Sequence, residues 1–194
     1  GFYLVHYNAP LKKYDISPDL YFKNNFCQSI FSDKEQRLWI ATNNGLYRRK
    51  RSSATVDRFT ILSADGIVNS VFEIRNIAVA NNKLFVATAG EGLLVFNRNG
   101  TRLLKQIRFD KLPGQVNNAL YVIALNMDTV IAAISNSLVY INTNNLAAKA
   151  FSLPAWHMQN NFIAALFKDS HNSIYASSNK DEKSFFRKQQ GEKE

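Results

Sequence analysis

A short strand-like segment recurs four times along the chain at a nearly constant spacing. Each copy consists of β-branched, aromatic, aliphatic and small residues without Pro or Gly, a composition that favours a β-strand. The copies span residues 38–42, 84–88, 130–134 and 174–178, so their first residues lie 46, 46 and 44 positions apart. A period of about 40–50 residues with several short strands per unit is typical of a β-propeller, in which each repeat forms one blade.

The repeat predicts an all-β chain, namely a fragment of a β-propeller with about four consecutive four-stranded antiparallel blades. The ring is expected to be incomplete, because 194 residues hold about four units and propellers close with ~4–8 blades. Residues 1–179 are assigned to this partial propeller. Residues 180–194 form a charged tail with two interpretations. Either Phe185-Phe186-Arg187 resumes the third strand of a truncated or irregular last blade, or the tail is unpaired.

The first complete unit predicts where its strands and turns lie. Strands are expected at residues 26–32, 38–42, 46–49 and near 58–62, with Gly45 supplying a positive φ after the second strand. Asp33 and Asp169 recur in the first turn of their units, where a carboxylate can accept backbone N–H bonds and fix a hairpin. Asn81 and Asn82 occupy the corresponding tighter turn of the second unit, because Asn tolerates left-handed geometry.

Composition and motifs argue against several functional classes. Apolar residues make up 46% of the chain, which suits a packed core, and no apolar run approaches the ~20 residues that span a bilayer. One cysteine and three separated histidines offer no metal-ligand spacing, so neither a metal nor a cofactor is expected. Phosphate-binding loops, nucleophile elbows and Cys/His clusters are missing from the sequence. The prediction is that this fragment is not an enzyme.

The net charge of +9 raises the question of nucleic-acid binding. The densest basic run, residues 48–51, is expected to be a solvated blade edge or loop. The remaining cations are dispersed and lack the aromatic interleaving of a single-strand binding groove, so no nucleic-acid partner is predicted. Attraction to an acidic polysaccharide or an anionic membrane surface is a weaker alternative.

Loops on one predicted face supply the candidate ligand-binding residues. In a propeller the connections between the second and third strands, and between successive blades, emerge at the same end. Trp156 and His157 join an aromatic ring to polar side chains, a combination that suits a sugar, although Trp156 can equally fill the gap between blades. The predicted ligand-binding residues are Asn43, Asn44, Gln115, Trp156 and His157, and the same face is expected to include Gly90 and Glu91.

The stretch at residues 30–48, Ile-Phe-Ser-Asp-Lys-Glu-Gln-Arg-Leu-Trp-Ile-Ala-Thr-Asn-Asn-Gly-Leu-Tyr-Arg, resembles the two-component regulator propeller repeat. Residues 169–179 repeat part of it, and Thr88 with Gly92-Leu93 keeps a smaller part. Gln36 replaces the usual turn Gly, and the fourth unit lacks the Gly-Leu pair. The resemblance implies a periplasmic input region of a hybrid histidine kinase, found above all in Bacteroidetes-type bacteria, which recognises glycan fragments. The implied partners are an oligosaccharide or small molecule, the remaining blades and signalling domains, and a second copy in a homodimer.

Two other function classes stay open beside the ligand sensor. The second is a propeller that serves as a protein-interaction scaffold or dimerisation surface without small-molecule binding. The third is a carbohydrate-active enzyme built on a propeller. Any kinase activity would belong to the parent protein rather than to these 194 residues.

Overall fold

The computed structural model describes residues 3–18, 25–50, 56–59, 73–108, 118–134, 137–152, 163–178 and 185–188. All regular elements in these segments are β-strands, and none of the described residues is helical. The strands form three four-stranded sheets, one three-stranded sheet and one two-stranded hairpin. Each described strand pairs with the strand that precedes or follows it in the chain, and every pairing is antiparallel. The predicted all-β fold of consecutive blades is confirmed, with a fourth blade that has three described strands rather than four.

Each sheet is a simple up-and-down meander. The hairpin pairs β1 (Tyr3–Asn8) with β2 (Lys13–Pro18). The first sheet contains β3 (Cys27–Ser32), β4 (Arg37–Thr42), β5 (Gly45–Lys50) and β6 (Val56–Phe59). The second contains β7 (Ile74–Ala80), β8 (Lys83–Thr88), β9 (Leu93–Asn97) and β10 (Leu103–Ile107). The third contains β11 (Ala119–Ala124), β12 (Thr129–Ile134), β13 (Ser137–Asn142) and β14 (Ala148–Ser152).

The fourth sheet contains β15 (Ile163–Lys168), β16 (Ile174–Ser178) and β17 (Phe185–Lys188). β17 pairs with β16, so Phe185 to Arg187 do resume a third strand, and the alternative of a wholly unpaired tail is wrong for these residues. The four recurring segments form β4, β8, β12 and β16, the second strand of every sheet. The last strand of the first sheet starts at Val56, earlier than expected, and its predicted end beyond Phe59 lies outside the described residues.

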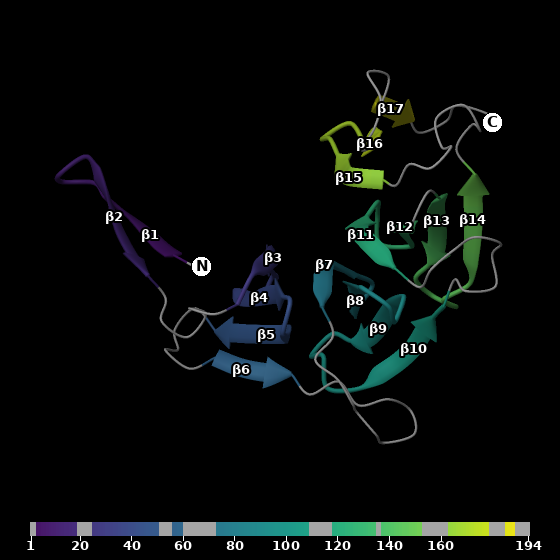
Figure 1. Cartoon of the computed structure of the whole chain (residues 1–194), viewed down its shortest axis with the longest axis horizontal. Helices are drawn as coiled ribbons and strands as arrows, with labels where there is room; N and C mark the ends of the chain where they lie inside the picture. Colours follow the sequence, from purple (N-terminus) through teal and green to yellow (C-terminus); the bar gives the residue numbers. More distant parts are fainter. Residues whose placement is uncertain are drawn as a thin grey trace.

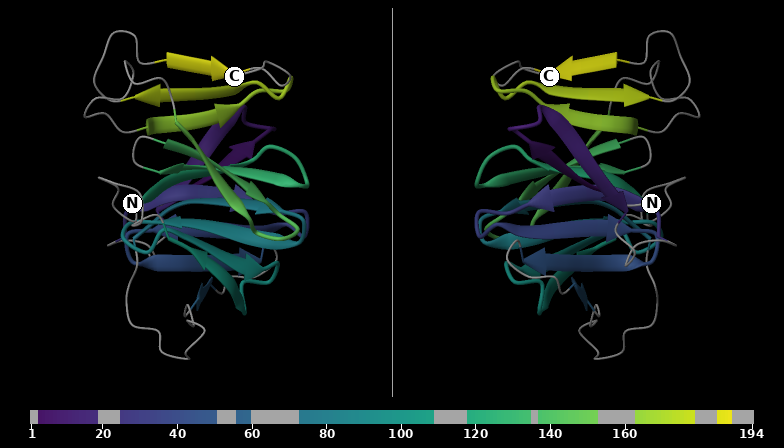
Figure 2. Two further views of the ribbon diagram at one scale, coloured as in Figure 1. Left: turned by 90° about the vertical axis from the view of Figure 1, so that its right-hand side faces the viewer. Right: turned by 90° about the vertical axis from the view of Figure 1, so that its left-hand side faces the viewer.

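The four sheets stand next to one another along an arc (Figure 1). Their first strands, β3, β7, β11 and β15, lie on the inner side of the arc, and the later strands follow toward the outside (Figure 1). In side view the strands lie along about the same axis, with neighbours pointing in opposite directions, and their turns gather at two ends (Figure 2). We name the end with the β4–β5 and β8–β9 turns the upper end, and the end with the β3–β4 and β9–β10 turns the lower end.

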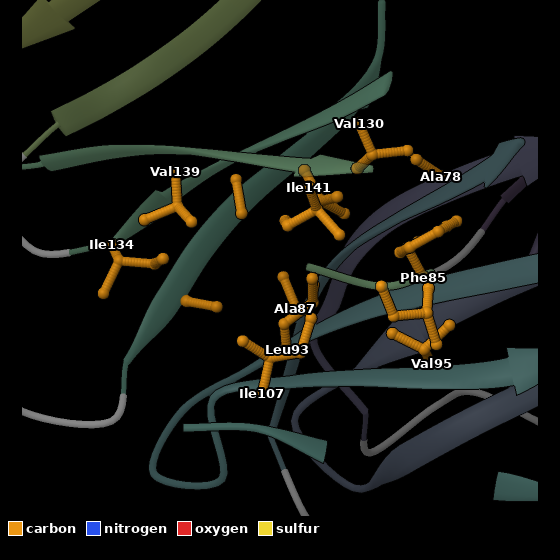
Figure 3. Close-up of a cluster of buried hydrophobic side chains, with 14 of the residues drawn as sticks. Ala78, Phe85, Ala87, Leu93, Val95, Ile107, Val130, Ile134, Val139 and Ile141 are labelled. Carbon is orange, nitrogen blue, oxygen red and sulfur yellow. The ribbon is translucent and has the colours of Figure 1, made fainter. Parts of the chain in front are cut away.

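Apolar side chains fill the space between successive sheets. Along β8, Leu84 and Val86 pack toward the first sheet, whereas Phe85 and Ala87 pack toward the third. Figure 3 shows Phe85 among side chains from the second and third sheets. Because alternate residues of the second strand of a sheet are buried on opposite faces, the recurring segments are apolar throughout rather than alternating. Burial of one such large side chain stabilises the fold by about 1.5–3 kcal/mol.

Every first strand carries a β-bulge close to its start. The register breaks between Cys27 and Ser29 in β3, and at the corresponding position of β7, β11 and β15. The extra residues are Gln28, Arg75, Leu120 and Ala164. A bulge bends its strand and re-aims the extra side chain, so the inner strands present these residues differently from a regular alternation.

Backbone geometry at the turns follows the sequence-based expectation. Gly45 has a φ of 112°, and Asn81 and Asn82 have φ values of 44° and 53°. Gln36, where the related repeats have Gly, also adopts a left-handed φ of 58°. Asn172 has a φ of 63° in the matching turn of the fourth sheet, so this conformation is a feature of the repeat rather than of the residue type.

Candidate functional site

At the lower end, Asp33 gathers hydrogen bonds from three other residues of its hairpin. Its Oδ1 accepts bonds from the backbone N–H groups of Glu35 and Arg37, at 2.9 and 3.0 Å. Its Oδ2 accepts the Trp39 Nε1–H at 2.9 Å and the Arg37 Nε–H at 2.6 Å. The expected role of Asp33 in fixing the turn is therefore confirmed, with two buried side-chain donors added.

The same arrangement recurs in the fourth sheet. Asp169 Oδ1 accepts the backbone N–H groups of His171 and Ser173, both at 2.8 Å. Its Oδ2 accepts the Tyr175 hydroxyl at 3.0 Å, and Tyr175 occupies the position of Trp39 in the repeat. His171 is exposed in this turn. Because two sheets share the contact, these carboxylates are structural groups of the blade.

Hydrogen bonding determines the ionisation of both carboxyls. Burial alone raises the pKa of Asp33, but the bonds from Trp39 and Arg37 outweigh it and hold the pKa below its ordinary value of 3.8. For Asp169, the bonds from Ser173, Tyr175 and His171 likewise overcome the effect of burial and lower its pKa. Both groups are therefore ionised at neutral pH, and neither is poised to act as a general acid.

Arginines connect this lower end to the second sheet. The guanidinium carbons of Arg37 and Arg48 lie 5.6 and 5.7 Å from the ring centre of Trp39. Asn99, in the β9–β10 turn, accepts Arg37 Nη1–H through its Oδ1 at 2.8 Å and Arg48 Nη1–H through its backbone oxygen at 3.3 Å. The expectation that Arg48 belongs to a solvated edge is wrong, because its side chain is only 18% exposed and also pairs with Asp57. Its burial follows from its place opposite Trp39 in the β4–β5 ladder.

At the upper end, the structure places two of the predicted ligand-binding residues in the β4–β5 turn. Phe26 N–H donates to Asn43 Oδ1 at 2.8 Å, and Asn43 N–H donates to the Phe26 oxygen at 3.1 Å. Arg58 Nη2–H donates to the Asn44 backbone oxygen and to its Oδ1, both at 3.1 Å. These contacts organise the turn itself. Gln115, Trp156 and His157 lie outside the described residues, so a shared site with the asparagines stays a prediction.

The upper end of the second sheet contains Glu91, another residue of the predicted loop face. Gln106 Nε2–H donates to its backbone oxygen at 3.0 Å and to its Oε2 at 2.9 Å. Arg108 Nη1 lies 4.0 Å from the same carboxylate oxygen. Gly90 is exposed beside it, with a φ of 99°.

A further group lies at the inner side of this end, and of its residues the sequence predicted only Asn43. We define the inner rim as Phe26, Gln28, Asn43, Glu73 and Arg75. Gln28 Nε2–H donates to Glu73 Oε1 at 3.1 Å, and Arg75 Nη1 lies 3.2 Å from the same oxygen. Phe26 is 71% exposed. The recurrence of Asn-Asn-Phe at residues 24–26 and 160–162 was the available signal, but it does not reveal that Phe26 faces solvent.

Within the described segments, no group of three or more His, Cys, Asp or Glu side chains is arranged to hold a metal ion. The described part of the chain also contains no helix with the length and apolar character needed to cross a membrane.

Comparisons with known proteins bear on both the repeat and the fold. Residues 21–44 match the sequence profile named Two component regulator propeller, a stretch that includes Asp33, Trp39 and Asn43. No curated protein matches the sequence. Among solved structures, the extracellular domain assigned to the hybrid two component system BT3049 from B. thetaiotaomicron superposes with a TM-score of 0.70. The two sequences are 19% identical over 95% of this chain and 26% of that one.

Two further structures have the same fold at lower similarity. The extracellular domain assigned to the one component system BT4673 from B. thetaiotaomicron has a TM-score of 0.51 and 17% identity, over 85% of this chain and 30% of that one. The β-propeller domain of Myceliophteria thermophila Cps50 (Swd1) has a TM-score of 0.58 and 12% identity, over 80% and 51%. The chain thus spans about a quarter to a half of these relatives. Residues 21–44 thus match a two component regulator propeller repeat, and the chain has the fold of consecutive β-propeller blades.

Proposed function

We propose that this chain is part of the periplasmic ligand-sensing propeller of a hybrid two-component histidine kinase, and that it recognises a glycan fragment without turning it over. The observation that carries the proposal is the regulator-type repeat at residues 21–44, in which the Asp33–Trp39 contact is fully formed. The fold similarity over 95% of the chain to an extracellular domain of a hybrid two component system supports the same assignment.

The chemistry of the upper end supports a binding role rather than catalysis. Glu73 and Glu91 are the carboxylates that the described part of this end presents, and each lies within hydrogen-bonding distance of a Gln amide and near an Arg. The amide and guanidinium groups around each carboxylate are hydrogen-bond donors, and donors of this kind suit the hydroxyl groups of a bound ligand. Signalling domains and the other blades of the parent protein would transmit the binding event, with a homodimer as the expected signalling unit.

The test is calorimetry of the native protein that carries this chain against a panel of oligosaccharides. Binding of at least one glycan is expected, with no change in the sugar after long incubation as judged by mass spectrometry. Trp156→Ala is expected to weaken binding by about 1–3 kcal/mol if that ring is a desolvated anchor, while Trp156→Phe retains most of the affinity. If no glycan binds while a protein partner does, the sensor assignment is wrong and the scaffold function replaces it. Release of shortened sugar would instead favour the enzyme.

A further inference from the structure

The inner rim combines a solvent-facing aromatic ring with a hydrogen-bonded backbone. Phe26 is 71% exposed, yet its N–H and its carbonyl oxygen are both bonded to Asn43 across the upper end of the sheet. The part of an apolar ring that stays exposed to water contributes no hydrophobic stabilisation to the fold. Because the backbone at Phe26 is already held, binding a partner would require little further ordering of this segment. Phe26 is therefore pre-organised as a contact surface.

The polar side chains of the rim stand on the neighbouring bulges. Gln28 is the extra residue of the β3 bulge, and Arg75 is the extra residue of the β7 bulge. Both side chains converge on Glu73 Oε1, at 3.1 and 3.2 Å, so the two inner strands are joined at this level. Just below, Asn76 Nδ2–H donates to Ser29 Oγ and Asn76 Oδ1 accepts the Val122 N–H, which extends the connection to the third sheet.

The charges of the rim cancel. Glu73 and Arg75 form an ion pair in which the side chains are 32% and 37% exposed, and Gln28 and Asn43 are uncharged. Glu91 and Arg108 repeat this pairing at the outer part of the same end, 4.0 Å apart. An acidic ligand would need a cation that is not already compensated by a carboxylate, because desolvating an anion without a partner is costly. The rim therefore suits an uncharged ligand that offers both an apolar face and hydroxyl groups.

We propose that the inner rim is a saccharide subsite in which Phe26 stacks on the face of a neutral sugar ring, and Gln28, Glu73 and Arg75 bond its hydroxyl groups. This proposal rests on the proposed glycan-sensing function and specifies its ligand as neutral rather than uronic or sulfated. Asn43 acts as a positioning residue that holds Phe26, in place of the direct ligand contact that the sequence predicts for it. The geometry assigns the subsite to the boundary between the first and second sheets.

The experiment uses the native protein that carries this chain and two sets of probes. The neutral set contains malto-, xylo- and manno-oligosaccharides, and the acidic set contains oligogalacturonates and sulfated disaccharides. Phe26→Ala is expected to weaken neutral-sugar binding by about tenfold or more, and Phe26→Trp to retain it. Phe167→Ala is the matched control, because Phe167 is also an exposed aromatic residue, at 63%, and lies on the first strand of another sheet. Phe26→Leu replaces Phe26→Ala if the latter fails to fold.

A charge variant tests the specificity. Glu73→Gln keeps the size of the side chain but leaves Arg75 uncompensated, so the rim gains one positive charge. Oligogalacturonate binding is expected to increase by about tenfold at low salt and to fall back as salt is added, because screening weakens charge interactions between exposed groups.

The outcomes separate this inference from the proposed function. If the wild-type protein binds neutral sugars with an affinity that Phe26→Ala and Phe26→Leu leave unchanged, the rim is not the subsite, although the sensor function stands. If the wild-type protein binds acidic sugars in preference, the assignment to neutral ligands is wrong and the sensor function again stands. If it binds neither set, the rim is refuted as a subsite for neutral sugars, and the wider oligosaccharide panel decides the sensor function.

Discussion

Asp33 is the residue on which the lower end of the first sheet most depends. It is the acceptor for two backbone N–H groups and for the side chains of Arg37 and Trp39, both of which are buried. Removing the carboxylate would leave a buried guanidinium and a buried indole N–H without this acceptor, and such groups carry their full desolvation penalty. The Asp residue of this repeat is therefore expected to act chiefly through stability.

The first prediction is that Asp33→Ala lowers the free energy of unfolding by about 2–4 kcal/mol. The matched control is Asp57→Ala, because Asp57 also pairs with an arginine, Arg48, but its side chain is 55% exposed. An exposed ion pair of this kind contributes about 0–1 kcal/mol. Urea unfolding followed by tryptophan fluorescence measures both variants. Equal losses in the two variants would show that the buried acceptor is not what matters.

The second prediction concerns acid stability. Because the pKa of Asp33 is lower in the folded protein than its ordinary value of 3.8, the carboxylate stabilises the fold above that pH. This stabilisation is lost as the pH falls below about 4 through the folded-state pKa, and Asp169 contributes in the same direction. Urea midpoints measured between pH 6 and pH 2 should therefore fall steeply below pH 4. The fall should be shallower in Asp33→Asn, and an unchanged slope in that variant would contradict the assignment.

The elements show which features of the fold are readable from the sequence. β4, β8, β12 and β16 were predictable because burial on both faces leaves an apolar segment that recurs at a fixed period. The left-handed turns at Gly45 and Asn81 were predictable because few residue types adopt that backbone conformation. The bulges at Gln28 and Arg75 were not predictable, since the residues of a bulge have no distinctive composition.

The candidate site was harder to predict from the sequence than the fold, for the same reason. Whether Phe26 faces solvent depends on the bulge that follows it and on its hydrogen bonds to Asn43. Neither feature follows from residue type alone. Asn43 and Asn44 were correctly placed at the upper end. Their side chains, however, bond neighbouring groups of the protein, so in this structure they stabilise the turn. The basic run failed as a guide to exposure, because strand alternation turns Arg48 toward Trp39.

The third prediction concerns the β8–β9 turn, which contains two glycines with positive φ. A Cβ at Gly92, where φ is 74°, would collide with the backbone oxygen of Ile107 on β10. A Cβ at Gly90, where φ is 99°, would meet no atom within 4 Å. Gly90→Ala should therefore cost only the backbone strain of about 1–2 kcal/mol, whereas Gly92→Ala should cost clearly more. Thermal unfolding of the two variants measures the difference. The reverse order would contradict the role of this close approach.

At the scale of the whole molecule, the sheets differ in how fully their faces are covered. On the first sheet, Trp39 is fully buried and Phe31 is half-buried against the second sheet. On the fourth sheet, the residues at the same repeat positions are Tyr175, which is half-buried, and Phe167, which is 63% exposed. Their rings lie 6.3 Å apart between centres. No described residue covers this face as the second sheet covers the first.

The last prediction follows from that uncovered face. The 194-residue chain, prepared by itself, is expected to bind an apolar dye and to self-associate, because blade faces that present aromatic residues pack against apolar surfaces. Phe167→Lys places a charge on the face and should reduce both dye fluorescence and the apparent mass in sedimentation. Leu104→Lys is the control, since Leu104 is 42% exposed on β10, an outer strand, away from this face. The substitution at Phe167 removes little buried area, so its effect on unfolding should be small. Self-association that responds equally to both substitutions would reflect charge alone. A wild-type chain that stays monomeric and binds no dye would show that this face is covered by other parts of the same molecule.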